Sequence, residues 1–320
     1  MYEFGPVYDL SVKNILLGTD FSPASDAAFH AVLKLCLEFN ARLHILNVFE
    51  YDTLPPSESD GVVAEFDSFR QRAEFSLDSL VQDARRIGIP CEGSIEEGIP
   101  DLIILEAANT KQVDLIALGT RPIHGFERLV FGSTAEAVLR QARCPVFTVG
   151  PRATNERSSG GTIVFATDFH SATLNALYSA VSFSKKMRLP LHCLNVLPRG
   201  LERNSDRGTI PAIVTEALRH LVSEVDGEVI PPVCAVTYGS EISTAVVEYA
   251  KRHNAELIVL GVRKSSLAAS HIPAHIAYRV IAEAPCPVLT TAYSAPGSPP
   301  PVRLRPSSVY RWPNKYLKMS

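Results

Sequence analysis

Residues Ile15–Phe49 read "ILLGTDFSPASDAAFHAVLKLCLEFNARLHILNVF", and this stretch decides the fold. An apolar run from Val12 to Gly18 ends in turn residues, and another apolar run follows from Arg42 to Phe49. Between them, apolar side chains recur at the spacing of one helix face: Ala28, Val32, Leu35, Cys36 and Phe39. Ser22 or Ser25 can cap that helix. The stretch therefore predicts a strand, a helix and a second strand.

The same pattern is written again, without a gap, in Ile163–Leu197: "IVFATDFHSATLNALYSAVSFSKKMRLPLHCLNVL". Thr19-Asp20-Phe21 aligns with Thr167-Asp168-Phe169, and Leu46-Asn47-Val48 aligns with Leu194-Asn195-Val196. Farther along, "VDLIALGTR" matches "AELIVLGVR", and "CPVFTV" matches "CPVLTT". The chain is therefore expected to hold two tandem copies of one domain, because the repeat is far too long for a solenoid.

Strands and helices alternate through each copy. The first copy continues with a long helix near Val63–Arg86, a strand at Pro90–Glu96, a helix that opens at Pro100, a buried strand at Val113–Leu118, and a last helix and strand that end at Val149. Strands separated by helices favour a parallel sheet with right-handed crossovers. We predict the α/β class, with two tandem doubly wound domains that each contain a five-stranded parallel sheet.

Composition sets the expected domain boundaries. The first domain is expected at residues 1–152, a polar and turn-prone linker at 153–161, and the second domain at 162–293. Residues 294–320 form a Pro-rich tail whose charged side chains are all cationic. A disordered tail is the first interpretation, and a strip that docks through Trp312, Tyr310 and Tyr316 is the other.

Charge and cysteine usage narrow the class of protein. The chain has 320 residues with 31 Lys plus Arg against 34 Asp plus Glu, so no overall charge points to nucleic acid or a membrane as a partner. We find neither a secretory signal nor an apolar run of about 20 residues that could cross a bilayer. The six cysteines show no metal-ligand spacing, and His271 and His275 lack a third ligand. A cytoplasmic protein with small buried cysteines and no metal site is expected.

Ligands of open parallel sheets bind beyond the carboxyl ends of the strands, where the strand order reverses. Three loops of the first copy are expected there: Gly18-Thr19-Asp20, Asn47-Val48-Phe49 and Gly119-Thr120-Arg121. Gly132-Ser133-Thr134 then starts the last helix, where free N–H groups suit a phosphate. Asp20 can accept hydrogen bonds from a ribose or a base, and Arg121 can add a cationic contact. A helix cap or turn role for Asp20, and an ordinary N-cap at Gly132-Ser133, are the structural alternatives.

These motifs, in this order and spacing, resemble the universal stress protein family over both copies. The resemblance rests on "TDFS", "LNV", "EEGIPDLIILEAA", "DLIALGTR" and a Gly-Ser pair placed after Gly119. It implies a Rossmann-like fold of the adenine nucleotide alpha hydrolase type, a role in the stress response, and binding of ATP or a related adenine nucleotide, with or without Mg²⁺. The implied nucleotide-binding residues are Thr19, Asp20, Val48, Gly119, Arg121, Gly132, Ser133 and Thr134. It also implies that the last strands, Val146–Val149 and Val288–Thr291, pair within the chain.

The chain departs from the family's ATP-binding pattern at Pro122, which replaces the middle glycine and has no N–H to give a phosphate. In the second copy Lys264, Ala274 and His275 replace the two glycines and the serine, so nucleotide is expected in the first domain alone. We expect no enzyme beyond a slow ATP hydrolysis, with regulation or scaffolding through an unknown protein partner.

Three alternatives stay open. One is a nucleotide-independent interaction module in which both sites have decayed. Another is an ATP-consuming transferase whose substrate-binding insertion is the acidic loop Tyr51–Gly61. The third concerns assembly, because two chains could also form a homodimer.

Overall fold

The computed structural model describes residues 11–50, 60–121, 132–154, 160–169, 171–203, 208–223, 231–262 and 273–291. Several of the predictions fall outside these ranges and are not addressed by the structure. They concern most of the acidic loop after Tyr51, Pro122, the interior of the linker, Lys264 with His271, and the tail from Ser294. Within the described part of the chain, no helix is long and apolar enough to cross a membrane.

The first copy contains five strands and four helices in alternation. Their bounds are β1 Asn14–Thr19, α1 Pro23–Phe39, β2 Arg42–Phe49, α2 Asp60–Arg86, β3 Cys91–Glu97, α3 Pro100–Thr110, β4 Leu115–Gly119, α4 Ser133–Gln141 and β5 Val146–Val149. The helix α1 begins after Ser22, whose hydroxyl accepts the N–H of Ser25, so the predicted serine cap is confirmed.

The second copy repeats this order and adds one short 3₁₀ helix. Its elements are β6 Thr162–Ala166, α5 Ser171–Met187, β7 Leu191–Pro198, η2 Arg199–Arg203, α6 Thr209–Ser223, β8 Val233–Gly239, α7 Ile242–Arg252, β9 Ala255–Gly261, α8 Pro273–Glu283 and β10 Val288–Thr291. The prediction of two tandem doubly wound domains is confirmed.

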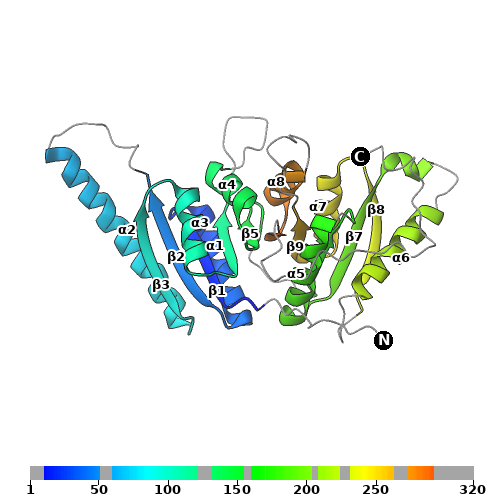
Figure 1. Ribbon diagram of the computed structural model, residues 1–320, viewed down its shortest axis with the longest axis horizontal. Coiled ribbons are helices and arrows are strands. Elements are labelled where there is room, and N and C mark those ends of the chain that lie inside the picture. The colour runs from blue at the N-terminus through cyan, green and yellow to red at the C-terminus, as the bar shows by residue number, and fades with distance from the viewer. Residues whose placement is uncertain are drawn as a thin grey trace.

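All the described strands join one sheet that crosses the whole molecule (Figure 1). The order is β3-β2-β1-β4-β5-β10-β9-β6-β7-β8, so each half has its strand reversal between the first and fourth strands of its copy. Pairing is parallel inside each copy and antiparallel between β5 and β10, where Phe147 lies opposite Leu289. The Thr148 hydroxyl donates to the Val288 carbonyl at 3.0 Å, and the Thr290 hydroxyl donates to the Val146 carbonyl at 3.3 Å. The expected pairing of the last strands is therefore confirmed.

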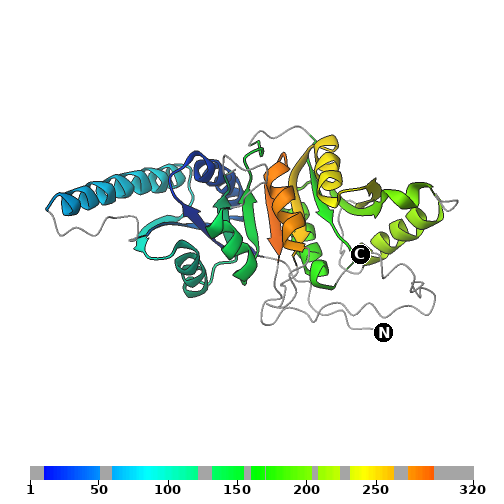
Figure 2. The ribbon, with the colours of Figure 1, turned by 90° about the horizontal axis from the view of Figure 1, so that it is seen from above.

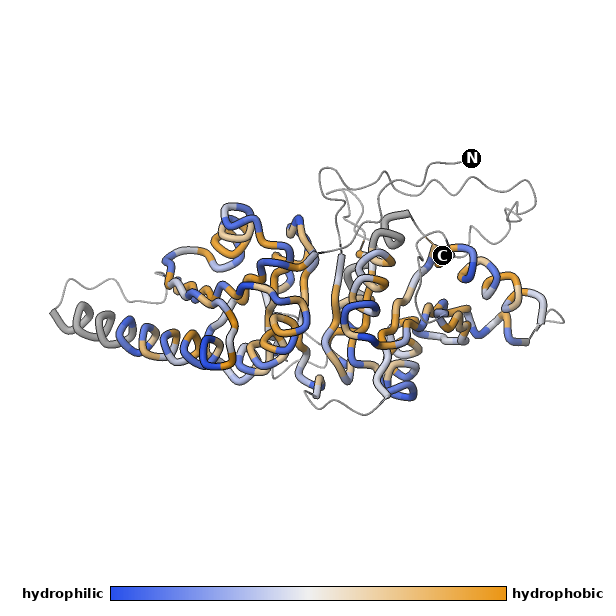
Figure 3. Tube along the Cα trace, turned by 90° about the horizontal axis from the view of Figure 1, so that it is seen from below, coloured by the Kyte–Doolittle hydropathy of each residue, from blue (hydrophilic) through white to orange (hydrophobic). Residues whose placement is uncertain are grey.

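Helices cover both faces of this sheet, as the view from above shows (Figure 2). Successive strand residues point to opposite faces, so Ile15 and Leu17 pack under α1 while Leu16 packs under α3 and α4. One apolar layer contains α1, α2, α5 and α6, and the other contains α3, α4, α7 and α8. Most strands are apolar along most of their length, although the edge strand β3 is largely polar, and the helices alternate between hydrophobic and hydrophilic residues (Figure 3).

The six cysteines all carry free thiols. Cys36, Cys91, Cys193 and Cys286 are buried, as predicted, and Cys144 and Cys234 are partly buried. Burial raises the pKa of the Cys36 thiol to about 12 and that of the Cys91 thiol to about 11, so these thiols stay protonated at neutral pH. They act as small apolar groups.

Candidate functional site

The turn after β1 is held by the Thr19 side chain. The Thr19 hydroxyl accepts the Phe21 N–H at 3.1 Å and donates to the Ser25 hydroxyl at 3.1 Å, and Phe21 has a left-handed φ of 58°. The second copy repeats the arrangement, because the Thr167 hydroxyl accepts the Phe169 N–H at 3.0 Å and Phe169 has a φ of 62°. The Thr-Asp-Phe motif therefore builds the same turn in both copies. Thr19 itself is buried and uses its hydroxyl inside the turn.

Asn47, next to Val48 on β2, makes a hydrogen bond to the end of the neighbouring strand β1. Its Nδ2 donates to the Thr19 carbonyl at 2.8 Å, and Asn195 makes the equivalent bond to the Thr167 carbonyl at 2.8 Å. Asn47 Oδ1 is buried and finds no hydrogen-bond donor in the described part of the chain. The sequence placed Asn47 in a loop at the strand ends but did not predict its bond to Thr19. An identical polar residue in a buried strand of both copies was the available signal.

Asp20 is placed at the rim of the strand ends and is already bonded. Its carboxylate accepts the Ser22 N–H at 3.0 Å, and its other oxygen pairs with the Arg121 guanidinium. Burial by itself raises the pKa of Asp20, but hydrogen bonds from Ser22 and Ser25 and the charge of Arg121 outweigh it and leave the pKa below its usual value. Asp20 is thus an anion at neutral pH. The ion pair joins the ends of β1 and β4, the two strands between which the strand order reverses.

Gly119 ends β4 and lies against the start of α1. A Cβ at this position would lie 2.1 Å from the Ala24 carbonyl oxygen and 2.7 Å from the Ser25 nitrogen. Both neighbours are backbone atoms, so the absence of a side chain lets the helix start pack on the strand end. Packing alone explains this glycine.

Gly132 has the opposite environment. It is the N-cap of α4, it offers no side-chain hydrogen bond to the first turn, and a Cβ added to it would meet no described atom within 4 Å. Ser133 is exposed and Thr134 is half-buried. The first N–H groups of α4 are therefore not capped by the residue before it, and these groups form the positive end of the helix dipole. Open space beside such donors can admit an anion.

The structure thus brings four of the expected residues together at one strand-end turn: Thr19, Asp20, Gly119 and Arg121. Val48 is half-buried on β2, which pairs with β1. Gly132, Ser133 and Thr134 lie at the start of α4, which precedes the strand β5 that pairs with β4. Among the residues that the structure describes, no group of His, Cys, Asp and Glu could hold a metal ion. The available chemistry is a set of backbone donors, one cation and one carboxylate.

Known proteins match both copies. The model of the universal stress protein family matches residues 11–150 and 161–291. A universal stress protein of Methanocaldococcus jannaschii is 33% identical over 141 residues, which are 43% of this chain and 81% of that protein. A putative universal stress protein of Staphylococcus haemolyticus is 33% identical over 143 residues, which are 44% of this chain and 86% of that protein.

A solved structure also matches across both halves. The crystal structure of a universal stress protein from Archaeoglobus fulgidus superposes with a TM-score of 0.67 at 22% identity, and the match covers 88% of this chain and 98% of that one. At this identity the likeness shows the fold alone. The two segments matched by the family model, however, together span most of the chain. The chain therefore belongs to the universal stress protein family.

Proposed function

We propose that the first domain binds ATP or a related adenine nucleotide, and that the protein acts in the cytoplasm as a stress-response regulator or scaffold. Gly132, Ser133 and Thr134 would hold the phosphates, while Asp20 and the backbone of Val48 would hold the nucleoside. The observation that carries the proposal is that no described atom lies within 4 Å of a Cβ placed on Gly132, beside the first turn of α4, which has no side-chain cap. Membership of the universal stress protein family supports it.

Nucleotide binding at this site would have to break the ion pair between Asp20 and Arg121. Both side chains are substantially exposed, at 47% and 64%, so water screens their attraction. Nucleotide phosphates would compete with Asp20 for the guanidinium, because Arg binds phosphate oxygens in a fork geometry. The freed carboxylate would then accept hydroxyl groups of the ribose. Thr19 and Gly119 would set the position of this rim without touching the ligand.

The second copy serves as the internal control. Ala274 and His275 take the places of Gly132 and Ser133, so we propose that the second domain binds no nucleotide. Gly132→Val would put a branched side chain into the open space and remove phosphate binding. Its matched control is Ala274→Val at the equivalent position of α8.

Isothermal titration calorimetry with ATP, ADP and AMP on the full chain tests the assignment. One site per chain in the unchanged protein, abolished by Gly132→Val and kept by Ala274→Val, supports it. Circular dichroism of the variants shows that loss of binding is not loss of fold.

An interaction module without nucleotide is the second candidate. The observation that favours it is that Asp20 and Arg121 satisfy each other. In that case the unchanged protein gives no heat with any of the three nucleotides, and Gly132-Ser133 is only a helix start.

A further inference from the structure

The two copies meet at two equivalent junctions. Antiparallel pairing of β5 with β10 relates the copies by a pseudo-twofold axis, and α1 packs against α5 across it. In the gapless alignment Leu35 corresponds to Phe183, and Phe39 corresponds to Met187. At one junction the rings of Phe39 and Phe183 pack with their centroids 4.8 Å apart. At the other junction the equivalent positions hold Leu35 and Met187, which have no aromatic ring.

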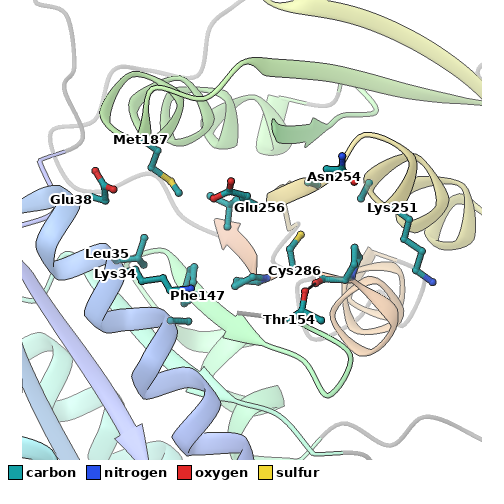
Figure 4. A pocket seen from close by; sticks show the side chains of 16 residues that line it. Lys34, Leu35, Glu38, Phe147, Thr154, Met187, Lys251, Asn254, Glu256 and Cys286 are labelled. Carbon is teal, nitrogen blue, oxygen red and sulfur yellow. Dashed lines mark hydrogen bonds between the residues drawn. The ribbon is translucent and has the colours of Figure 1, made fainter. Parts of the chain in front are cut away.

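A cavity of about 220 Å³ lies at this second junction. Leu35 of α1 and Phe147 of β5 line it from the first copy, and Met187 at the end of α5, Leu257 and Pro287 line it from the second. Figure 4 shows Met187 across from Leu35, with Phe147 and Cys286 between the two copies. The repeat places Leu289 where the cavity has Phe147, so the junction of Phe39 and Phe183 has two rings where the junction with the cavity has a single ring. The difference is about one aromatic ring.

The charged side chains that line this cavity are balanced. Lys34 and Lys251 contribute two ammonium groups, and Glu38 and Glu256 contribute two carboxylates. Asn254 adds an amide that can donate and accept. A mixed lining of apolar side chains and balanced charges favours an uncharged ligand with a polar substituent over an ion.

We propose that this junction cavity binds a small uncharged aromatic molecule of the phenol class, whose ring takes the space that the second ring fills at the other junction. The size is suitable, because an apolar cavity of about 150 Å³ is enough to hold benzene. The ligand touches both copies, so its binding stabilises their association. The cavity is separate from the nucleotide site, because α1 begins beside Asp20 and lines the cavity near its other end with Lys34, Leu35 and Glu38.

The chain carries its own reporter for this test. It has three methionines, and two of them, Met1 and Met319, lie near the ends of the chain. Labelling the methionine methyl groups with ¹³C therefore gives a short spectrum in which Met187→Leu identifies the cavity signal. Titration of the full chain with phenol should shift the Met187 methyl signal until it saturates, and leave the Met1 and Met319 signals in place.

Leu35→Phe tests the location. It gives the first copy the ring that Phe183 supplies in the second, fills the cavity, and should weaken phenol binding at least about tenfold. Leu37→Phe makes the same substitution on the exposed face of α1, where Leu37 is 55% exposed, and should leave binding unchanged. If Leu35→Phe does not fold, Ala31→Leu fills the cavity from the same helix.

Three results would overturn the proposal. The first is a Met187 signal that does not respond to phenol or responds without saturation. The second is equal binding by the filled variant and by the unchanged protein. The third is benzoate binding as tightly as phenol, because this would show that the cavity does not prefer an uncharged ligand.

Discussion

Substitution by alanine should change the free energy of unfolding much more at Gly119 than at Gly132. Gly119→Ala would place a Cβ 2.1 Å from the Ala24 carbonyl oxygen and 2.3 Å from its carbon, so the start of α1 must move. Overpacking of this kind costs about 1–3 kcal/mol, and contact with backbone, which cannot rotate away as a side chain can, places the change at the upper end of that range. We expect a loss of about 2–3 kcal/mol in the free energy of unfolding.

Gly132→Ala is the matched comparison. Its new methyl group meets no described atom within 4 Å, so no overpacking cost arises. Alanine is a poorer N-cap than glycine, but it also reduces the entropy of the unfolded chain. These effects oppose each other, and we expect a change within about 1 kcal/mol.

Urea unfolding of the full chain, followed by far-UV circular dichroism, measures both variants. Far-UV circular dichroism reports directly on helices and strands, whereas the only tryptophan, Trp312, lies outside the described residues. For a chain of this size that unfolds as one unit, a loss of about 2 kcal/mol should lower the melting temperature by roughly 3 °C. Equal destabilisation by the two substitutions would refute the separation of Gly119 as a packing residue from Gly132 as a binding residue.

Two further changes probe the second copy and the contact between copies. Burial and the nearby His253 lower the pKa of His192. The stability that its neutral ring contributes is therefore present above the unfolded pKa of about 6.5. It is lost as the pH falls through the lower folded pKa. His192→Gln should flatten this dependence in thermal melts between about pH 5 and about pH 8, and an unchanged slope would contradict it. Gly150→Ala would place a Cβ 1.9 Å from the Ile281 carbonyl oxygen of the other copy and should cost about 2 kcal/mol or more. The control Gly208→Ala meets no described atom within 4 Å and should leave the melting temperature unchanged. Equal melting temperatures of the two variants would show that the junction tolerates the methyl group.

Periodicity and repeats predicted the elements of the fold closely. The strand β2 has the predicted bounds Arg42–Phe49, and the long helix begins at Asp60, slightly before the prediction. Helix ends are less certain than helix centres, because the first turn depends on caps and tertiary contacts more than on apolar spacing. Pairing of β5 with β10 was expected from the family resemblance, since two apolar edge strands do not by themselves specify their partner.

Less of the candidate site could be predicted, because its contacts join distant parts of the chain. Arg121 was expected to be near a phosphate, but its ion pair with Asp20 spans 101 positions of sequence. The glycine pattern also treated Gly119 and Gly132 alike. Only the positions of neighbouring atoms separate a glycine that packs against backbone from one that faces open space.

A chain that contains the same domain twice offers its own control for these assignments. Asn47 and Asn195 make the same 2.8 Å bond, so folding of the strand ends is enough to explain both. No such explanation covers positions where the aligned residues differ, as at Gly132 against Ala274 or Leu35 against Phe183. If those differences were neutral, exchanging the residues between the copies would alter stability alone. We expect instead that Gly132→Ala weakens nucleotide binding and that Leu35→Phe weakens phenol binding, and that each exchange leaves the affinity for the other ligand unchanged.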